Sequence, residues 1–182
     1  MKKITALFLA ILLTLSLAGG AFAAGETFTT RYFTLELPEG WIANTEDLED
    51  ESEDGPKTLG YFSGPEEISL EAAAFLTYFD ELQDFSSWSA SEEEIEEYKE
   101  LMMEVLEEDN PEFLGTLTAG SIPFILIRCT DEEGDYLYAD TVTNGNAIQF
   151  EAYMTDGEDD YPLTDEAIEE FKTILATFKP AA

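Results

Sequence analysis

The sequence predicts an α+β protein whose central sheet is largely antiparallel. The first observation is the order of the elements: strand patterns, a long amphipathic segment, more strand patterns and a second amphipathic segment. Regular alternation of strands and helices would instead indicate a parallel sheet. The second observation is Asn144-Gly145 between two runs of alternating polarity. This pair predicts a β-hairpin, because both loop residues must accept a positive φ angle.

The chain begins with a segment typical of a secretory signal peptide. Lys2 and Lys3 precede an apolar run that extends to about residue 18, and Ala21 and Ala23 form an A-x-A cleavage pattern. We therefore expect residues 1–23 to be removed, leaving residues 24–182 as a single α+β domain. The protein is then expected to be exported to the periplasm or the extracellular space, without a stable membrane anchor after cleavage.

Strands are expected in the next part of the chain. Phe33, Leu35 and Leu37 alternate with more polar residues up to a Pro-Glu-Gly turn. The acidic run at 46–54 is expected to be an exposed loop. TLGYFS and ISLEAAAFLTYF then predict a strand pair separated by a Gly-Pro turn, although the alanines of the second segment also suit a helix.

Two amphipathic helices are predicted. The first begins at a capping box formed by Ser91 and Glu94 and stops at Asn110-Pro111. The second begins at the N-cap Thr164 and ends by Pro180. The apolar residues at helical spacing are Ile95, Tyr98, Met102, Val105 and Leu106 in the first helix, and Ile168, Phe171, Leu175 and Phe178 in the second.

Strands are also predicted near 113–118 and 122–130. Ile125, Ile127 and Cys129 alternate along one face of the second strand. Cys129 is the only cysteine of the sequence, so an intrachain disulfide is impossible. We expect a buried, inert thiol at this position; a reactive thiol or an intermolecular bridge is the alternative.

The register of the hairpin follows from its turn. With Asn144 and Gly145 as the loop, one face is mostly apolar, and the other carries tyrosines and polar residues. The facing pairs are Leu137–Ala152, Ala139–Phe150 and Thr141–Ile148 on the first face, and Tyr136–Tyr153, Tyr138–Glu151 and Asp140–Gln149 on the second.

The second face is one candidate site. Tyr136, Tyr138, Tyr153 and Glu151 combine aromatic rings with polar tips, which suits the binding of a protein or peptide partner. The alternative is a sheet face that a helix partly covers.

An acidic rim at one end of the hairpin is the other candidate site. Because the strands are antiparallel, the turn 131–135 approaches the segment 156–160, and a calcium ion would relieve the repulsion between their carboxylates. The segment that begins at Asp156 is not an EF-hand loop, since Ala167 stands where a glutamate is required. A solvated rim is therefore the alternative. The candidate metal ligands are Asp131, Asp135, Asp156, Glu158 and Asp160.

Composition narrows the classes of function. With 41 acidic and 8 basic residues the formal net charge is −33, which disfavours nucleic acids and anionic lipids and favours cations or basic partners. The sequence has no histidine and no glycine-rich phosphate loop. Ser–His–Asp and Cys–His catalysis and histidine-ligated metals are thus excluded. We expect a non-enzymatic protein without a cofactor; a carboxylate-based hydrolase is a third hypothesis.

Two stretches resemble a known family. YFTLELPEGW is similar to the F-x-L-x-x-P-x-G-W opening of PsbP-like proteins, and FKTILATFKP is similar to their closing helix. The fold of this superfamily is shared with a Ran-binding nuclear import factor and with DcrB-like envelope proteins. The resemblance implies an α/β/α sandwich, with a largely antiparallel central sheet flanked by helices. It also implies an uncharacterised exported bacterial branch, because this chain lacks the metal-binding histidines of photosynthetic members.

These observations lead to a functional expectation. The protein is expected to be an exported accessory or binding protein of the bacterial envelope, with a protein or peptide partner that carries basic groups. The alternative is a calcium-binding envelope protein that uses the acidic rim at 131–135 and 156–160.

Overall fold

The computed structural model describes residues 25–45, 48, 56–65, 67–130 and 134–181. The predicted signal peptide lies outside these residues, as does the acidic run 46–54 apart from Leu48. The described elements are β1 (Thr27–Thr29), β2 (Phe33–Glu36), β3 (Ile42–Asn44), β4 (Lys57–Ser63), β5 (Ser69–Tyr78), η1 (Asp80–Leu82), α2 (Glu92–Val105), η2 (Glu107–Asp109), β6 (Glu112–Ala119), β7 (Ile122–Thr130), β8 (Asp135–Thr143), β9 (Asn146–Thr155), β10 (Asp160–Tyr161), α3 (Asp165–Leu175) and β11 (Lys179–Pro180).

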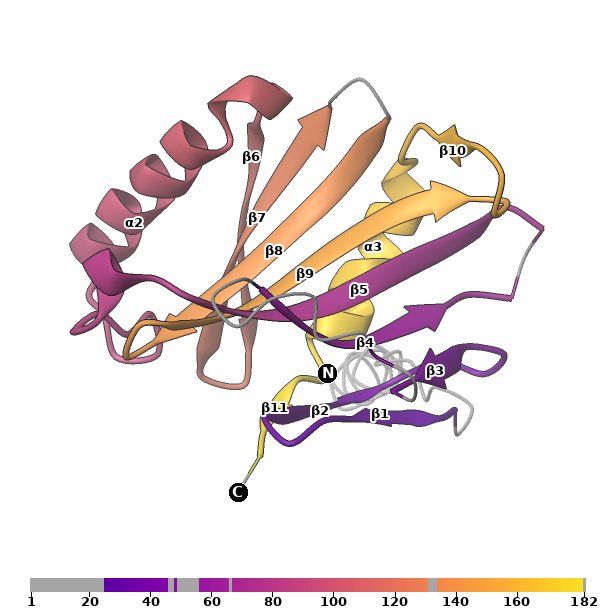
Figure 1. The fold of residues 1–182 in the computed structure, drawn as a ribbon, viewed down its shortest axis with the longest axis horizontal. Helices are drawn as coiled ribbons and strands as arrows, with labels where there is room; N and C mark the ends of the chain where they lie inside the picture. Colours follow the sequence, from indigo (N-terminus) through magenta and orange to yellow (C-terminus); the bar gives the residue numbers. More distant parts are fainter. Residues whose placement is uncertain (1–24, 46–47, 49–55, 66, 131–133, 182) are drawn as a thin grey trace, which may run out of the picture.

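The described strands form two antiparallel sheets (Figure 1). The larger sheet has the order β3-β4-β5-β9-β8-β7-β6, with β10 paired to β9, and the smaller has the order β1-β2-β11. All of the strand pairs found in them are antiparallel. Together with the helices α2 and α3, these sheets confirm the predicted α+β class. The alanine-rich segment is strand β5, because it pairs on both sides with β4 and β9.

The β8–β9 hairpin has the predicted turn and register. Asn144 and Gly145 have φ angles of 50° and 76°, as a two-residue turn with two positive φ values requires. Tyr136 lies opposite Tyr153, and the predicted pairing continues along both strands to the turn. A side chain at position 145 would collide with the Tyr78 ring, at 2.8 Å from the added Cβ. The glycine is therefore required both by the turn and by the segment packed over it.

Two hydrophobic clusters lie along the larger sheet. The first contains the buried residues of α3 and of the smaller sheet, together with the apolar face of the hairpin, such as Ala139 and Phe150. The second contains Tyr98 and Met102 of α2 and the other face, such as Tyr138. Because successive side chains of a strand point to opposite faces, each cluster collects one face of β8 and β9.

The helices begin at the predicted caps but end earlier than predicted, α2 at Val105 and α3 at Leu175. Ser91 and Glu94 form the capping box of α2, and Thr164 caps α3. All four residues of the predicted stripe in the second helix are buried. In the first helix, however, Val105 is 59% exposed. The helix ends at this residue and the chain turns into η2.

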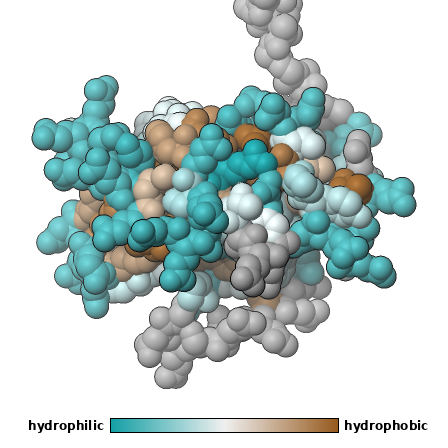
Figure 2. All heavy atoms as spheres, turned by 90° about the horizontal axis from the view of Figure 1, so that it is seen from above, coloured by the Kyte–Doolittle hydropathy of each residue, from teal (hydrophilic) through white to brown (hydrophobic). Residues whose placement is uncertain are grey.

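Hydrophilic residues cover most of the molecule in the view of Figure 2, and hydrophobic residues show between them. Cys129 is fully buried, as predicted. None of the helices among the described residues is long and apolar enough to span a membrane.

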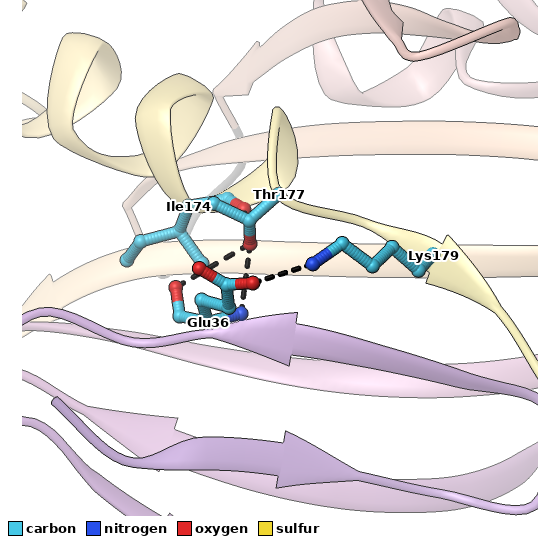
Figure 3. Close-up of polar contacts among 4 residues, drawn as sticks. All are labelled: Glu36, Ile174, Thr177 and Lys179. Carbon is cyan, nitrogen blue, oxygen red and sulfur yellow. Dashed lines mark hydrogen bonds and ion pairs between the residues drawn. The ribbon is translucent and has the colours of Figure 1, made fainter. Parts of the chain in front are cut away.

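A polar contact joins the end of α3 to the smaller sheet (Figure 3). The Thr177 hydroxyl accepts a hydrogen bond from the backbone N–H of Glu36 at 2.8 Å and donates to the Ile174 carbonyl at 2.7 Å. Lys179 pairs with the Glu36 carboxylate in the same place, but both of these side chains are more than 60% exposed. We therefore expect the hydroxyl to contribute more to the free energy of unfolding than the ion pair does, since exposed ion pairs contribute little.

We expect Thr177→Val to lower the free energy of unfolding by about 0.5–1.5 kcal/mol, because valine keeps the shape and removes the hydrogen bonds of the hydroxyl. Urea denaturation measures this difference. Lys179→Gln is the control and should cost less than about 1 kcal/mol. Equal losses in the two variants would show that the ion pair, and not the hydroxyl, holds the helix end.

Candidate functional site

A groove of about 840 Å³ lies at the end of the larger sheet where β8 begins and β9 ends. It contains residues of both sites predicted from the sequence, the tyrosine face and the acidic rim. The charged side chains among its described lining residues are all acidic. The lining residues are Glu71, Gly134, Asp135, Tyr136, Glu151, Tyr153, Thr155, Gly157, Glu158, Asp159 and Asp160.

Half-buried side chains of three adjacent strands lie in this groove. Tyr136 of β8 is opposite Tyr153 of β9, and Tyr153 is opposite Glu71 of β5. Glu151 lies two residues before Tyr153 and so points to the same side of the sheet. The Tyr136 hydroxyl donates to Asp109 Oδ2 at 3.0 Å, which links the groove to the segment after α2.

Partial burial changes the protonation equilibria of these groups. Burial raises the pKa of Tyr153 to about 12, with a further contribution from the negative charge of Glu71. Desolvation by burial also raises the pKa of Tyr136, and contacts with Cys129 and Asp109 raise it further. The pKa of Glu151 is raised by burial and by the nearby charge of Asp109. Both tyrosines are thus neutral at physiological pH, and Glu151 is an acid that a cation would stabilise in its charged form.

The acidic wall of the groove is a compact loop between β9 and β10. Asp156 Oδ1 accepts hydrogen bonds from the backbone N–H groups of Glu158 and Asp159, both at 3.0 Å. The Thr155 hydroxyl donates to the Asp159 carbonyl at 3.0 Å. Asp160 then pairs with Thr155 and returns the chain along the sheet. This geometry places Glu158, Asp159 and Asp160 beside the start of β8.

Three of the four predicted partner-binding residues, Tyr136, Glu151 and Tyr153, line the groove. Tyr138 does not, because it is only 5% exposed in the cluster that α2 covers. The tyrosine face is thus divided: its inner part is helix-covered core and its outer part is open. The alternative of a helix-covered face holds for the inner part, and partner binding at the outer part stays a prediction.

Those predicted metal ligands that the structure describes do not form a metal-binding group. Asp131 lies outside the described residues. Asp135 forms an ion pair with Arg128 and accepts a hydrogen bond from the Thr130 hydroxyl at 2.7 Å. Asp156 uses both carboxylate oxygens within its own loop, the second to accept from the Tyr161 hydroxyl at 2.8 Å. Glu158 and Asp160 line the groove, but the part of the chain that is described contains no group of three acids or cysteines suited to a metal ion.

Two groove features were missed at the sequence level. Glu71 reaches the groove because β5 pairs with β9. Asp109 reaches Tyr136 because η2 returns the chain toward the sheet after α2. Both depend on contacts between distant segments, and alternation within either segment gives no signal for them.

A second group of titratable side chains lies under α2. The Tyr98 hydroxyl donates to Asp140 Oδ1, and Asp140 is 1% exposed. Its other oxygen, Oδ2, has no hydrogen-bond partner among the described residues. Burial raises the pKa of Asp140 to about 7, against the opposing effects of Tyr98 and Gln149. Gln149 Nε2 itself donates to the Tyr138 hydroxyl, and its Oε1 accepts from Thr77 at 2.7 Å.

Comparison with known proteins gives a distant structural likeness. No protein-family model and no curated protein matches this sequence. Among solved structures, the chain is similar to the solution structure of cyanobacterial PsbP (CyanoP) from Synechocystis sp. PCC 6803, with a TM-score of 0.49 and 13% sequence identity. The match covers 90% of this chain and 96% of that chain.

Proposed function

We propose that this protein is an exported, non-enzymatic binding protein that holds a basic segment of a protein or peptide partner in the acidic groove. The observation that carries the proposal is the groove itself, which joins tyrosine rings and half-buried carboxylates in one open space. The signal-peptide pattern of residues 1–23 supports export.

The chemistry of the groove fits a guanidinium or ammonium group. Glu71 and Glu151 supply carboxylates at the sides of Tyr153, and the rings of Tyr136 and Tyr153 offer flat faces on which a guanidinium can stack. A carboxylate that is half removed from water attracts a cation more strongly than a fully exposed one does. The groove therefore selects a basic side chain by charge and by shape.

The protein supplies little positive charge of its own at this place. Arg128 approaches the groove through Asp135, and their ion pair neutralises one acid at the rim. Among the described residues, no ion pair joins the other acidic lining residues to a basic side chain, so a bound cation would relieve their mutual repulsion. Occupation by a basic partner is thus favourable on electrostatic grounds.

We also propose that the chain is a distant member of the PsbP-like superfamily with the α/β/α sandwich of that fold. The opening pattern F-x-L-x-x-P-x-G-W and the closing helix support this assignment. The two clusters along the larger sheet, one containing α3 and the other α2, are the arrangement such a sandwich requires.

The binding proposal is tested by calorimetric titration with a short capped peptide of alternating glycine and arginine, at near-physiological salt. We expect the double variant Glu71→Gln, Glu151→Gln to weaken binding by about tenfold or more, because it removes two partly desolvated charges and leaves the rings in place. The matched control is Glu93→Gln, Glu100→Gln, which changes the net charge equally on the exposed side of α2. The control should weaken binding by no more than about twofold.

Other outcomes would overturn the proposal. Equal losses in both double variants would mean that the peptide is attracted by the diffuse negative charge of the protein. Displacement of the peptide by calcium, but not by magnesium at equal ionic strength, would favour the calcium-binding alternative.

A further inference from the structure

Helix α2 has a small buried contact with the rest of the protein. Of its fourteen residues, Tyr98 and Met102 are the buried ones. Ile95 and Met103 add partial contacts, and the remaining positions are largely glutamates in water. A helix of this length is marginal in isolation, so these few contacts decide whether it stays in place.

The contact of α2 with the sheet is centred on a buried carboxyl group. Asp140 of β8 accepts a hydrogen bond from the Tyr98 hydroxyl through Oδ1, whereas Oδ2 has no partner among the described residues. An ionised carboxylate can accept several hydrogen bonds, but in this position it would accept one from Tyr98 and would be separated from water. A protonated carboxyl group would carry no such penalty.

The basic residues on the elements around Asp140, Lys99 of α2 and Arg128 of β7, form ion pairs with Glu96 and Asp135 rather than with Asp140. Tyr98 faces it from α2, and Tyr138 lies two residues earlier on the same side of β8. Gln149 is opposite on β9, and Ile125 is opposite on β7. The segment 79–85 contributes Phe79, Leu82 and Phe85 to the hydrophobic cluster. Acidic side chains of this segment and of α2 line a pocket beside Tyr98, namely Asp80, Glu81, Asp84, Glu94 and Glu97.

Other charges act on the site through Tyr138. Glu151, Tyr136 and Cys129 all lie close enough to Tyr138 to raise its pKa further, after burial and Asp140. Each of these groups is neutral when protonated and negative when deprotonated. Burial of Asp140 therefore disfavours its negative charge, and the opposing effects of Tyr98 and Gln149 are smaller.

We propose that α2 is a pH-sensitive cover of the sheet, held in place by the protonated form of Asp140 and released when Asp140 ionises. Tyr98 is the residue of α2 that contacts this carboxyl group. Release would expose the sheet face around Tyr138 and would also free Tyr136 from Asp109, which follows the helix.

The sign of the response follows from the direction of the shift. The pKa of Asp140 is raised from 3.8 to about 7, so the folded protein holds this proton more tightly than the unfolded chain does. The cover is therefore closed at mildly acidic pH and loosens as the pH rises through about 7. An ordinary exposed aspartate would not respond in this range.

Amide hydrogen exchange resolved along the chain tests the proposal. Protection of residues 92–105 should fall by about tenfold or more between about pH 5.5 and pH 8.5, after correction for intrinsic exchange, whereas protection of α3 (165–175) should change much less. In Asp140→Asn, which mimics the protonated form, α2 should stay protected within about twofold over the same range.

A second variant keeps the test decisive if Asp140→Asn folds poorly. Tyr98→Phe removes the hydrogen bond that lowers the pKa of Asp140, so the loss of α2 protection should move to higher pH. Equal losses in α2 and α3 would show general loosening rather than release of a cover and would overturn the proposal. So would a pH response in Asp140→Asn like that of the wild type. The test is independent of any ligand of the groove.

Discussion

Asp140→Asn is expected to stabilise the protein against unfolding by about 2–4 kcal/mol at pH 8.5. A pKa raised from 3.8 to about 7 by burial corresponds to a penalty of about 4 kcal/mol for the ionised folded state. Asparagine fills the same space without a charge, so this penalty disappears. The lower end of the range applies because release of α2 lets the ionised carboxylate regain water.

The pH profile of this variant is the discriminating measurement. Below about pH 4 Asp140 is largely protonated in both the folded and the unfolded wild type. The wild type and Asp140→Asn should then differ in stability only by the difference between two neutral side chains. The gain from Asp140→Asn should grow as pH rises from about 4 to about 7 and then level off. Comparing the two proteins at each pH removes the effect of the large overall negative charge, which they share apart from one group. A gain that is constant with pH would contradict this account.

Phe150→Ala is expected to be among the most damaging single changes, with a loss of about 3–5 kcal/mol in the free energy of unfolding. The Phe150 ring is fully buried and lies 5.3 Å from the Phe33 ring, 6.1 Å from Phe124 and 6.3 Å from Phe171, measured between centroids. It therefore joins β9 to β2, β7 and α3 at one point. Truncation leaves a cavity that these aromatic rings cannot fill by small movements.

Denaturant unfolding with Phe113→Ala as the control measures this effect. Phe113 is of the same type but is 38% exposed at the edge strand β6, so its loss should cost less than about 1.5 kcal/mol. Similar losses in the two variants would mean that the aromatic cluster does not form the centre of the core.

The fold was predictable where local rules decide it. Asn144-Gly145 determines the turn and, through period-two alternation, the whole register of β8 and β9. The capping residues Ser91 and Thr164 mark both helix starts. Those features depend only on residues that are neighbours along the chain, so they can be predicted from a single sequence. The smaller sheet was not predicted, because the pairing of β11 with β2 joins Pro180 to Phe33 across most of the chain.

The candidate site was predictable in part for the same reason. The hairpin register placed Tyr136, Glu151 and Tyr153 together, and the structure keeps them in the groove. What alternation cannot indicate is which part of a sheet face a helix covers. Tyr138 is therefore buried, and Glu71 joins the site through the pairing of β5 with β9. The fully buried carboxyl of Asp140 also depends on the placement of α2.

The central claim, that the acidic groove binds a basic partner, is tested most directly by a two-dimensional NMR titration of the ¹⁵N-labelled protein with the glycine–arginine peptide. We predict saturable shifts that are largest at the amides of Glu71, Tyr136, Glu151 and Tyr153. Shifts that do not saturate, or that are as large along the exposed glutamates of α2 as in the groove, would contradict it.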